Sequence, residues 1–158
     1  MQIQKIALKD NSQVAHLIRS TLEEMGVPKV GTAYGDKALD RMFQTYQRPR
    51  SVFYVAENGE EIIGCGGIAP LDNYDGNICE LQKMYVSKKT RGKGIATQLL
   101  EACLASAREF GFEACYLETM PYMNAAQGLY QKKGFTYLKE ALGDTGHHAC
   151  TVRMLNTF

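Results

Sequence analysis

The sequence predicts an α/β (α+β) fold: a mixed, mostly antiparallel central sheet with helices on both faces. Two observations carry this prediction. Strands over 51–56 and 61–69 are joined by Asn58-Gly59, a strong hairpin signal, so neighbouring strands in the middle of the chain are antiparallel. A strand, a long amphipathic helix and another strand succeed one another over 78–119, and such a unit requires a parallel, right-handed crossover.

Capping residues and glycines mark the ends of the predicted helices. Asn11 or Ser12 is suited to cap the first helix and Asp36 the second, while Gly26 and Gly111 stand where helices end. Between these points apolar residues either alternate or recur at helical spacing. The predicted elements, in chain order, are a strand over 3–8, helices over 11–25 and 36–46, strands over 51–56, 61–69 and 78–86, a helix over 94–110, a strand over 114–119, a helix over 124–132, and strands over 135–138 and 150–155.

Length and composition predict one globular domain over residues 1–158. The chain has 158 residues, 45% hydrophobic, and a net charge of only +1, which argues against a protein built mainly to bind nucleic acid. The sequence has neither an apolar run of membrane-spanning length nor a signal peptide at its start, so we expect no membrane partner and a cytoplasmic location. The odd number of five cysteines predicts buried free thiols, with Cys103 and Cys115 in apolar segments. His147, His148 and Cys150 lack a second ligand pair, so we expect no metal site.

A basic, glycine-containing turn precedes the predicted helix over 94–110. Residues 81–100 hold five basic residues and no acid, which leaves 13 basic and 17 acidic residues elsewhere. Gly92 and Gly94 allow a ligand to approach the backbone, and the start of a helix attracts anions. The turn therefore predicts a site for a compact anion such as a diphosphate, although a solvated lysine-rich loop is the alternative. The spacing fits neither a P-loop nor a full dinucleotide fingerprint.

Two motifs resemble those of the GCN5-related N-acetyltransferase (GNAT) superfamily. Arg91-x-x-Gly94-x-Ala96 is similar to the family's R/Q-x-x-G-x-G/A signature, and it stands between a strand and an amphipathic helix as the family requires. The segment 126–135 resembles the family's second motif, A-x-x-L-Y-x-x-x-G-F. The order of predicted elements is also that of the family, so the resemblance extends over nearly the whole chain.

The resemblance implies that the protein uses acetyl-coenzyme A. In similar enzymes the turn and the start of the helix hold the pyrophosphate, and the pantetheine arm pairs with the end of the preceding strand. Carried onto this sequence, the coenzyme-binding residues are Met84, Tyr85, Val86, Arg91, Gly92, Lys93, Gly94, Ile95, Ala96 and Thr97. A backbone amide at Tyr85 or Val86 is expected to polarise the thioester carbonyl.

Tyr130 and Glu80 are the expected catalytic residues. Tyr130 matches the motif tyrosine that lies near the coenzyme sulfur in similar enzymes; because a phenol is a weaker acid than a thiol, it can act by donating a hydrogen bond. The alternative for Tyr130 is a core tyrosine. Glu80, which strand periodicity places on one face with Gln82, Met84 and Val86, resembles the family's base, acting directly or through water. The alternative is that Glu80 is an acidic strand residue held in a salt bridge, and Glu118 is then the second candidate for the base.

The sequence departs from the family pattern before Tyr130. Where relatives often have an asparagine that contacts the pantetheine, this chain has Met123, and Asn124 comes directly after it. We therefore predict that Asn124 and Gln127 contact the coenzyme, with helix capping as the alternative for Asn124.

The acetyl acceptor is expected to be a small-molecule primary amine. In similar enzymes variable loops line the acceptor pocket, and Thr32 and Tyr34 are the candidates here, with an ordinary turn as the alternative. The acidic remainder of the chain favours a cationic acceptor. A protein amine and a non-catalytic coenzyme-binding module are the alternatives. The family often dimerises, and we expect Cys150–Leu155 to be an edge strand that is available for pairing across a homodimer.

Overall fold

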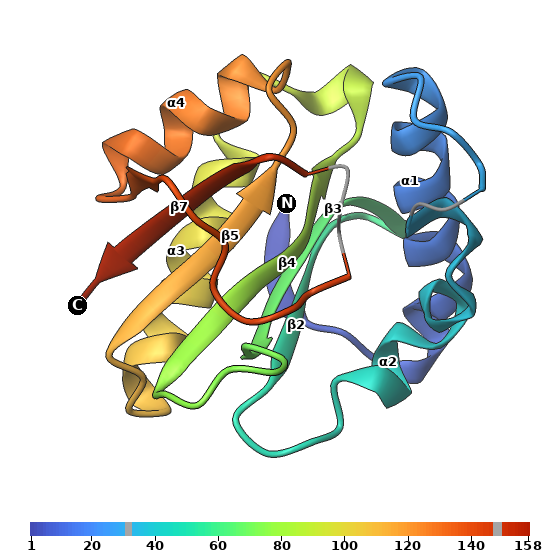
Figure 1. Cartoon of the computed structure of the whole chain (residues 1–158). Helices are drawn as coiled ribbons and strands as arrows, with labels where there is room; N and C mark the ends of the chain where they lie inside the picture. The colour runs from blue at the N-terminus through green and yellow to red at the C-terminus, as the bar shows by residue number, and fades with distance from the viewer. Residues whose placement is uncertain (31–32, 147–149) are drawn as a thin grey trace.

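A single mixed sheet organises the chain. The computed structural model describes residues 1–30, 33–146 and 150–158 (Figure 1). The seven strands lie in the order β1-β2-β3-β4-β5-β7-β6, and among these pairs only β4 and β5 are parallel. This confirms the predicted fold class. The strands are β1 (Gln2–Lys5), β2 (Val52–Asn58), β3 (Glu61–Pro70), β4 (Ile78–Val86), β5 (Ala114–Thr119), β6 (Thr136–Leu138) and β7 (Val152–Thr157).

Helices cover both faces of the sheet, as expected. Helix α1 (Asn11–Glu24) and the single turn α2 (Met42–Thr45) pack on one face, while α3 (Ile95–Glu109) and α4 (Asn124–Lys132) pack on the other (Figure 1). Helices α1 and α3 each bury a stripe of apolar residues at helical spacing against the sheet. The sheet therefore separates two hydrophobic cores, one on each of its faces. None of the helices in the described ranges has the length and apolar character needed to cross a bilayer.

The helix predicted over 36–46 is wrong in its form. Asp36 does cap its start, accepting a hydrogen bond from the N–H of Ala38 at 2.9 Å, but the chain then forms a 3-10 segment and, after it, the short α2. The backbone of Arg41 leaves the helical region between them. Asn11 stabilises this break, because its side-chain oxygen accepts from the N–H of Phe43 at 2.8 Å instead of capping α1.

The strand predicted over 150–155 is not an edge strand. It forms β7, which pairs with β5 on one side and with β6 on the other. The expected pairing of this strand across a dimer is therefore wrong, because both of its edges are already occupied. Sheet edges are provided by β1 and β6.

Candidate active site

The end of β4 separates from β5 and opens the sheet. Only Ile78 to Glu80 of β4 pair with β5, and beyond Glu80 no residue of β4 pairs with a residue of β5. Just past the separation, β4 carries a bulge: two residues, Lys83 and Met84, lie opposite the single residue Gly66 of β3. Lys83 has a φ of 54°, in the left-handed region. A bulge bends its strand, which explains why β4 turns away from β5 here.

The bulge also reverses which residues share a face of β4. Glu80 and Gln82 lie on the α1 face, but Met84 and Val86 pack with the α3 core, and Tyr85 takes the α1 face. The expectation that Glu80, Gln82, Met84 and Val86 share one face is therefore wrong. A Cβ at Gly66 would lie 2.7 Å from the end of the Met84 side chain, so a larger residue here would require that flexible side chain to move.

A cavity of about 580 Å³ lies in the opening between the two strands. It runs from the turn that precedes α3, past the exposed edge of β4, to the end of β5 and the start of α4. Its lining residues are Thr21, Met25, Leu81, Lys83, Met84, Tyr85, Val86, Thr90, Arg91, Gly92, Gly94, Ile95, Ala96, Thr97, Leu117, Glu118, Thr119, Met120, Tyr122, Met123, Asn124, Ala125, Ala126, Leu129, Tyr130 and Cys150.

Backbone N–H groups line one end of this cavity. The first backbone hydrogen bond of α3 runs from Gln98 N–H to the Gly94 carbonyl at 3.1 Å, so the preceding N–H groups of Ile95, Ala96 and Thr97 have no partner inside the helix. Gly94 caps the helix with a φ of 81° and has no side chain to satisfy those donors. These donors and the helix dipole together favour an anion at this end.

Glycine is needed in the turn for its backbone conformation. Gly92 and Gly94 have φ values of 78° and 81°, which L side chains rarely adopt. A Cβ built at either position would meet no atom within 4 Å, so the space in front of both residues is open. The turn therefore fits a bulky anion such as a diphosphate, as the motif predicts.

The basic side chains of the turn are less available than the sequence suggests. The guanidinium of Arg91 binds Glu24 at 2.6 and 2.9 Å, and its Nε donates to the Val86 carbonyl at 3.1 Å. Lys89 pairs with Glu61 at 2.6 Å. Arg91 thus fixes the turn against α1 and β4, and the positive end of the cavity comes largely from the backbone.

Tyr130 lies on α4 and lines the cavity. Its side chain is only 7% exposed and its ring packs against Phe135, with centroids 5.8 Å apart. Its hydroxyl makes no hydrogen bond to any residue that the structure describes, although it lines the cavity. Burial raises the pKa of Tyr130 well above its ordinary value. Tyr130 is therefore both a core residue and a cavity-lining residue, whereas the sequence left these two positions as alternatives.

Glu80 lies in the sheet beside the cavity and does not line it. Its side chain is 2% exposed, and its Oε1 accepts a hydrogen bond from Gln82 Nε2 at 2.7 Å. Burial raises the pKa of Glu80 to about 7, while the bond from Gln82 lowers it and the charge of Glu118 raises it. A carboxyl with a pKa near neutrality can both accept and release a proton under working conditions.

Glu118 places a carboxylate on the cavity wall. It lies on β5, and its Oε2 accepts from the Tyr116 hydroxyl at 2.5 Å, while its Oε1 accepts from Thr145. Tyr116 also receives the N–H of Leu142 at 3.3 Å, which fixes the connection between β6 and β7 over this part of the sheet. In Figure 1 this connection crosses in front of β4 and β5.

Some of the other expected site residues lie away from the cavity. Gln127 is buried and donates to the carbonyl of Met120 at 3.0 Å, while its oxygen accepts from Tyr137 at 2.8 Å, so it ties α4 to the preceding loop. Tyr34 directs its hydroxyl to Glu23 at 2.7 Å. Asn124 lines the cavity at the start of α4, next to Met123, which is the N-cap. Lys93 lies in the turn but does not line the cavity.

The candidate acceptor-binding residue Thr32 lies outside the described residues. The same holds for the two histidines at 147–148, which were weighed above as metal ligands. Their neighbour Cys150 lines the cavity.

A family model and a full-length relative identify the chain. The model described as "Acetyltransferase (GNAT) family" matches residues 14–135. The chain belongs to the GNAT family. The uncharacterized N-acetyltransferase YjgM of Escherichia coli is 42% identical over 154 residues, which cover 97% of this chain and 92% of that protein. The chain is accordingly an N-acetyltransferase, an enzyme of the acyltransferase class.

Solved structures of other GNAT proteins share the fold. A GNAT acetyltransferase from Staphylococcus aureus Mu50 superposes with a TM-score of 0.85 at 23% identity, over 99% of this chain and 98% of that one. The PaiA N-acetyltransferase of Thermoplasma acidophilum, solved in complex with coenzyme A, gives a TM-score of 0.77 at 16% identity, over 99% and 98% of the two chains. At these identities the likeness is one of fold.

Strand β3 contains a sequence signal for the bulge in its neighbour. It holds Gly64, Gly66 and Gly67, and glycines inside a strand often mark a bulge or a close backbone approach. The face prediction for β4 used only the alternation of residues within β4, so it could not take the glycines of β3 into account. The contributions of Thr21 and Met25 from α1 had no such signal, because only the packed fold brings the end of α1 to the cavity.

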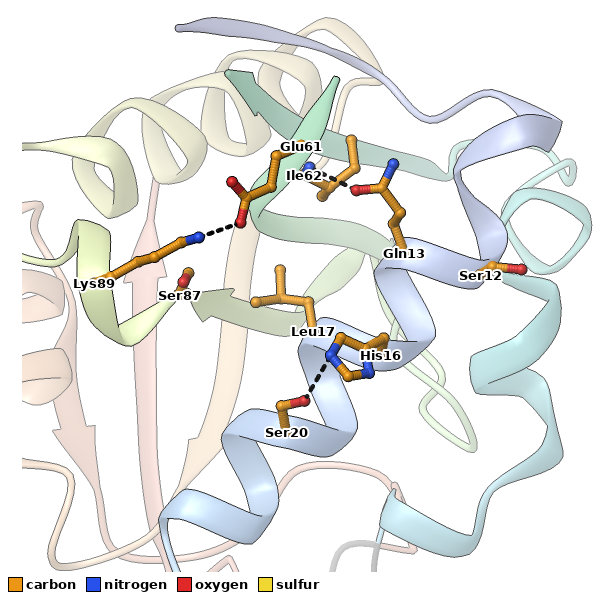
Figure 2. A pocket seen from close by; sticks show the side chains of 9 residues that line it. All are labelled: Ser12, Gln13, His16, Leu17, Ser20, Glu61, Ile62, Ser87 and Lys89. Carbon is orange, nitrogen blue, oxygen red and sulfur yellow. Dashed lines mark hydrogen bonds and ion pairs between the residues drawn. The ribbon is translucent and has the colours of Figure 1, made fainter. Parts of the chain in front are cut away.

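A second cavity, of about 430 Å³, differs from the first in its chemistry. It lies between α1 and the start of β3, and Figure 2 shows side chains there that bind each other across the surface. Lys89 pairs with Glu61, Gln13 accepts from Ile62 N–H at 3.0 Å, and His16 contacts Ser20 at 3.4 Å. The first turn of α1 and the 3-10 turn after β4 border this second cavity, and its carboxylate, Glu61, is exposed and already paired with Lys89. The residues of the family's first motif line the first cavity, which is therefore the candidate active site.

Proposed function

We propose that residues 1–158 form one catalytic domain that transfers the acetyl group of acetyl-coenzyme A to a primary amine of a small cationic molecule. One observation carries the proposal. A single cavity joins a helix start rich in free N–H donors to a buried tyrosine hydroxyl, and it extends to a carboxylate at its other end. These three features match a diphosphate, a leaving thiolate and an ammonium group.

The coenzyme is held mainly by backbone atoms. The turn and first residues of α3, from Gly92 to Thr97, provide N–H donors for the diphosphate, with the cation of Lys93 nearby. The exposed edge of β4 from Met84 to Val86, which β5 does not cover, is suited to pair with the pantetheine arm as an added strand would. Asn124 lines the cavity close to this path.

The transfer forms a bond from the amine nitrogen to the acetyl carbon, breaks the carbon–sulfur bond, and releases free coenzyme A and one proton for each ammonium ion consumed. An ammonium with an ordinary pKa near 10.4 must first lose a proton to become a nucleophile. Glu80, whose pKa burial raises to about 7, accepts that proton directly or through water.

Tyr130 acts on the leaving sulfur as a hydrogen-bond donor. Because burial raises its pKa, the phenol keeps its proton throughout the neutral range and does not transfer it fully. A buried donor at the cavity wall can stabilise the developing thiolate without large reorganisation. This role also explains why its hydroxyl has no partner within the described residues.

Two features favour a small cationic acceptor over a protein amine. Glu118 lines the cavity and Glu80 lies behind it, while Lys83, which also lines the cavity, offsets part of their charge. The connection between β6 and β7 is fastened above these carboxylates, through Leu142 to Tyr116 and through the carbonyl of Asp144 to Asn73 at 3.0 Å. This cover leaves less room for an extended polypeptide than an open groove would.

The test is chromatographic detection of free coenzyme A from acetyl-coenzyme A over a panel of polyamines, amino acids, aminoglycosides and lysine-containing peptides. A thiol-reactive dye is avoided because the chain itself has five cysteines. We expect release with one class of small amine. Release with peptides alone would contradict the small-molecule part of the proposal.

A further inference from the structure

A line of polar groups, buried at both ends and half-buried at Gln82, connects the end of α2 to Glu80. The hydroxyl of Tyr46, at the end of α2, donates to Gln82 Oε1 at 2.5 Å, and Gln82 Nε2 donates to Glu80 Oε1 at 2.7 Å. Tyr46 is 6% exposed and Glu80 is 2% exposed. Like Glu80, Tyr46 and Gln82 do not line the cavity, so an effect of either residue on the site would pass through Glu80.

The direction of these bonds matters because an amide has two different ends. The oxygen of Gln82 only accepts hydrogen bonds and its nitrogen only donates them. In the structure Tyr46 donates to this oxygen, which leaves the nitrogen to face Glu80. With the amide reversed, an oxygen would face the carboxylate, and that contact would favour the protonated carboxyl.

We propose that Tyr46 and Gln82 are positioning residues for acetyl transfer: Tyr46 fixes the amide of Gln82, and Gln82 holds the carboxylate of Glu80 in one orientation and in its basic form. The inference rests on the proposed function of Glu80 as the base. It assigns a role to α2, which the coenzyme-binding motifs do not include.

The surroundings of Glu80 show why a donor is needed. Burial raises the pKa of Glu80, as do the charges of Glu118 on β5 and Asp72 in the segment after β3, while Lys83 lowers it and Gln82 supplies the largest opposing contribution. Other titratable groups that influence or face it are Tyr46 and Cys115, with Tyr116 as its register partner and Cys150 beside the cavity. Without the bond from Gln82, the balance moves further toward the protonated acid.

Tyr46→Phe isolates the hydroxyl from the ring. The ring of Tyr46 packs against Phe53 with centroids 4.9 Å apart, and phenylalanine keeps this contact. Tyr54→Phe is the matched control, because Tyr54 makes a similar hydroxyl bond, to Ser106 at 2.6 Å, on the opposite face of the same sheet. Gln82→Met removes the donor itself at nearly constant volume.

The test measures the Glu80 carboxyl titration by carbon-13 NMR on the full chain, together with the pH profile of kcat/KM. A base must be deprotonated to act, so a raised pKa moves the acidic limb of the profile to higher pH. We expect both midpoints to rise by roughly half a pH unit in Tyr46→Phe and by about one unit in Gln82→Met. Tyr54→Phe should leave both in place, and kcat/KM should recover above the new midpoint.

The two measurements separate the inference from the proposal on which it rests. Unchanged carboxyl midpoints in both variants, with Glu80→Gln inactive, overturn the positioning role and leave Glu80 as the base. A carboxyl midpoint that moves while the pH profile does not overturns Glu80 as the base, and the positioning role with it. A melting temperature for each variant confirms that it is folded before either conclusion is drawn.

Discussion

The two ends of the candidate active-site cavity differ in the groups that they offer to a ligand. At the proposed coenzyme end the groups offered to a ligand are backbone N–H donors of one short segment, Gly92 to Thr97, and the side chain of Arg91 serves to fix that segment. At the proposed acceptor end they are side chains from separate strands: Glu118 on β5 lines the cavity and is bound by Thr145 of the β6–β7 connection, while Glu80 on β4 lies behind the wall and is bound by Gln82.

This difference suits the two ligands of an acetyltransferase. A coenzyme that is the same in every member of a family can be held by local backbone geometry, which tolerates many side chains. An acceptor that differs between members is better recognised by side chains on separate elements, since each can change alone. The comparison predicts that substitutions at the first end abolish coenzyme binding, while substitutions at the second change rate or amine affinity.

The largest effect is expected for Gly94→Glu. The new carboxylate lies where the diphosphate binds, and its backbone must hold a φ of 81°, so coenzyme A affinity should fall at least roughly a hundredfold. Calorimetric titration measures this. Gly94→Ala carries only the conformational cost and should bind more tightly than Gly94→Glu; equal losses in both variants would show that charge is irrelevant at this end.

Glu80→Gln should be the most damaging change at the acceptor end. General-base contributions are typically a hundredfold or more, so we expect kcat to fall by roughly that factor while the Kd for coenzyme A stays the same. Steady-state kinetics and calorimetry on the same preparation check both halves. A matching loss of coenzyme affinity would show that the two ends are not independent.

Tyr130→Phe lies between the two ends and should have an intermediate effect. Losing a hydrogen bond to a developing thiolate should lower kcat roughly ten- to a hundredfold, with little change in coenzyme binding. Because burial holds the pKa of Tyr130 far above neutrality, the shape of the pH profile between pH 6 and 9 should not change. An unchanged kcat would make Tyr130 a core residue only.

Glu118→Gln should have the smallest effect, and one confined to the amine. Removing one partly solvated charge should raise KM for a cationic acceptor by about three- to tenfold, with KM for acetyl-coenzyme A unchanged. The increase should shrink at high salt, where the wild-type attraction is itself screened. A rise in KM for a neutral amine of the same size would contradict an electrostatic role.

The same contrast explains how much could be predicted from the sequence. The turn at Gly92 and Gly94, the helix behind it and the order of strands along the chain depend on contiguous residues, and they are found as expected. The bulge at Lys83 was not predicted, because it depends on the residues opposite it in β3, and it reversed the expected faces of Met84 and Val86. Strand periodicity alone carries no information about a partner strand.

The remaining differences have the same origin. Gln127 has the right spacing to reach a coenzyme, but the loop before α4 supplies carbonyls that bind it instead. The helix expected to run through Arg41 breaks because Asn11, thirty-two residues from Phe43, takes a backbone N–H that an uninterrupted helix would use. Such long-range contacts decide side-chain roles, and no local pattern contains them.

Amide NMR shifts on addition of coenzyme A are the sharpest test of whether the anion site at the start of α3 is the coenzyme end of the active site. We predict that the largest shifts fall on Gly92 to Thr97 and on Met84 to Val86, with no change at His16 and Ser20 in the second cavity. Shifts centred on the second cavity, with the start of α3 unaffected, would contradict this assignment.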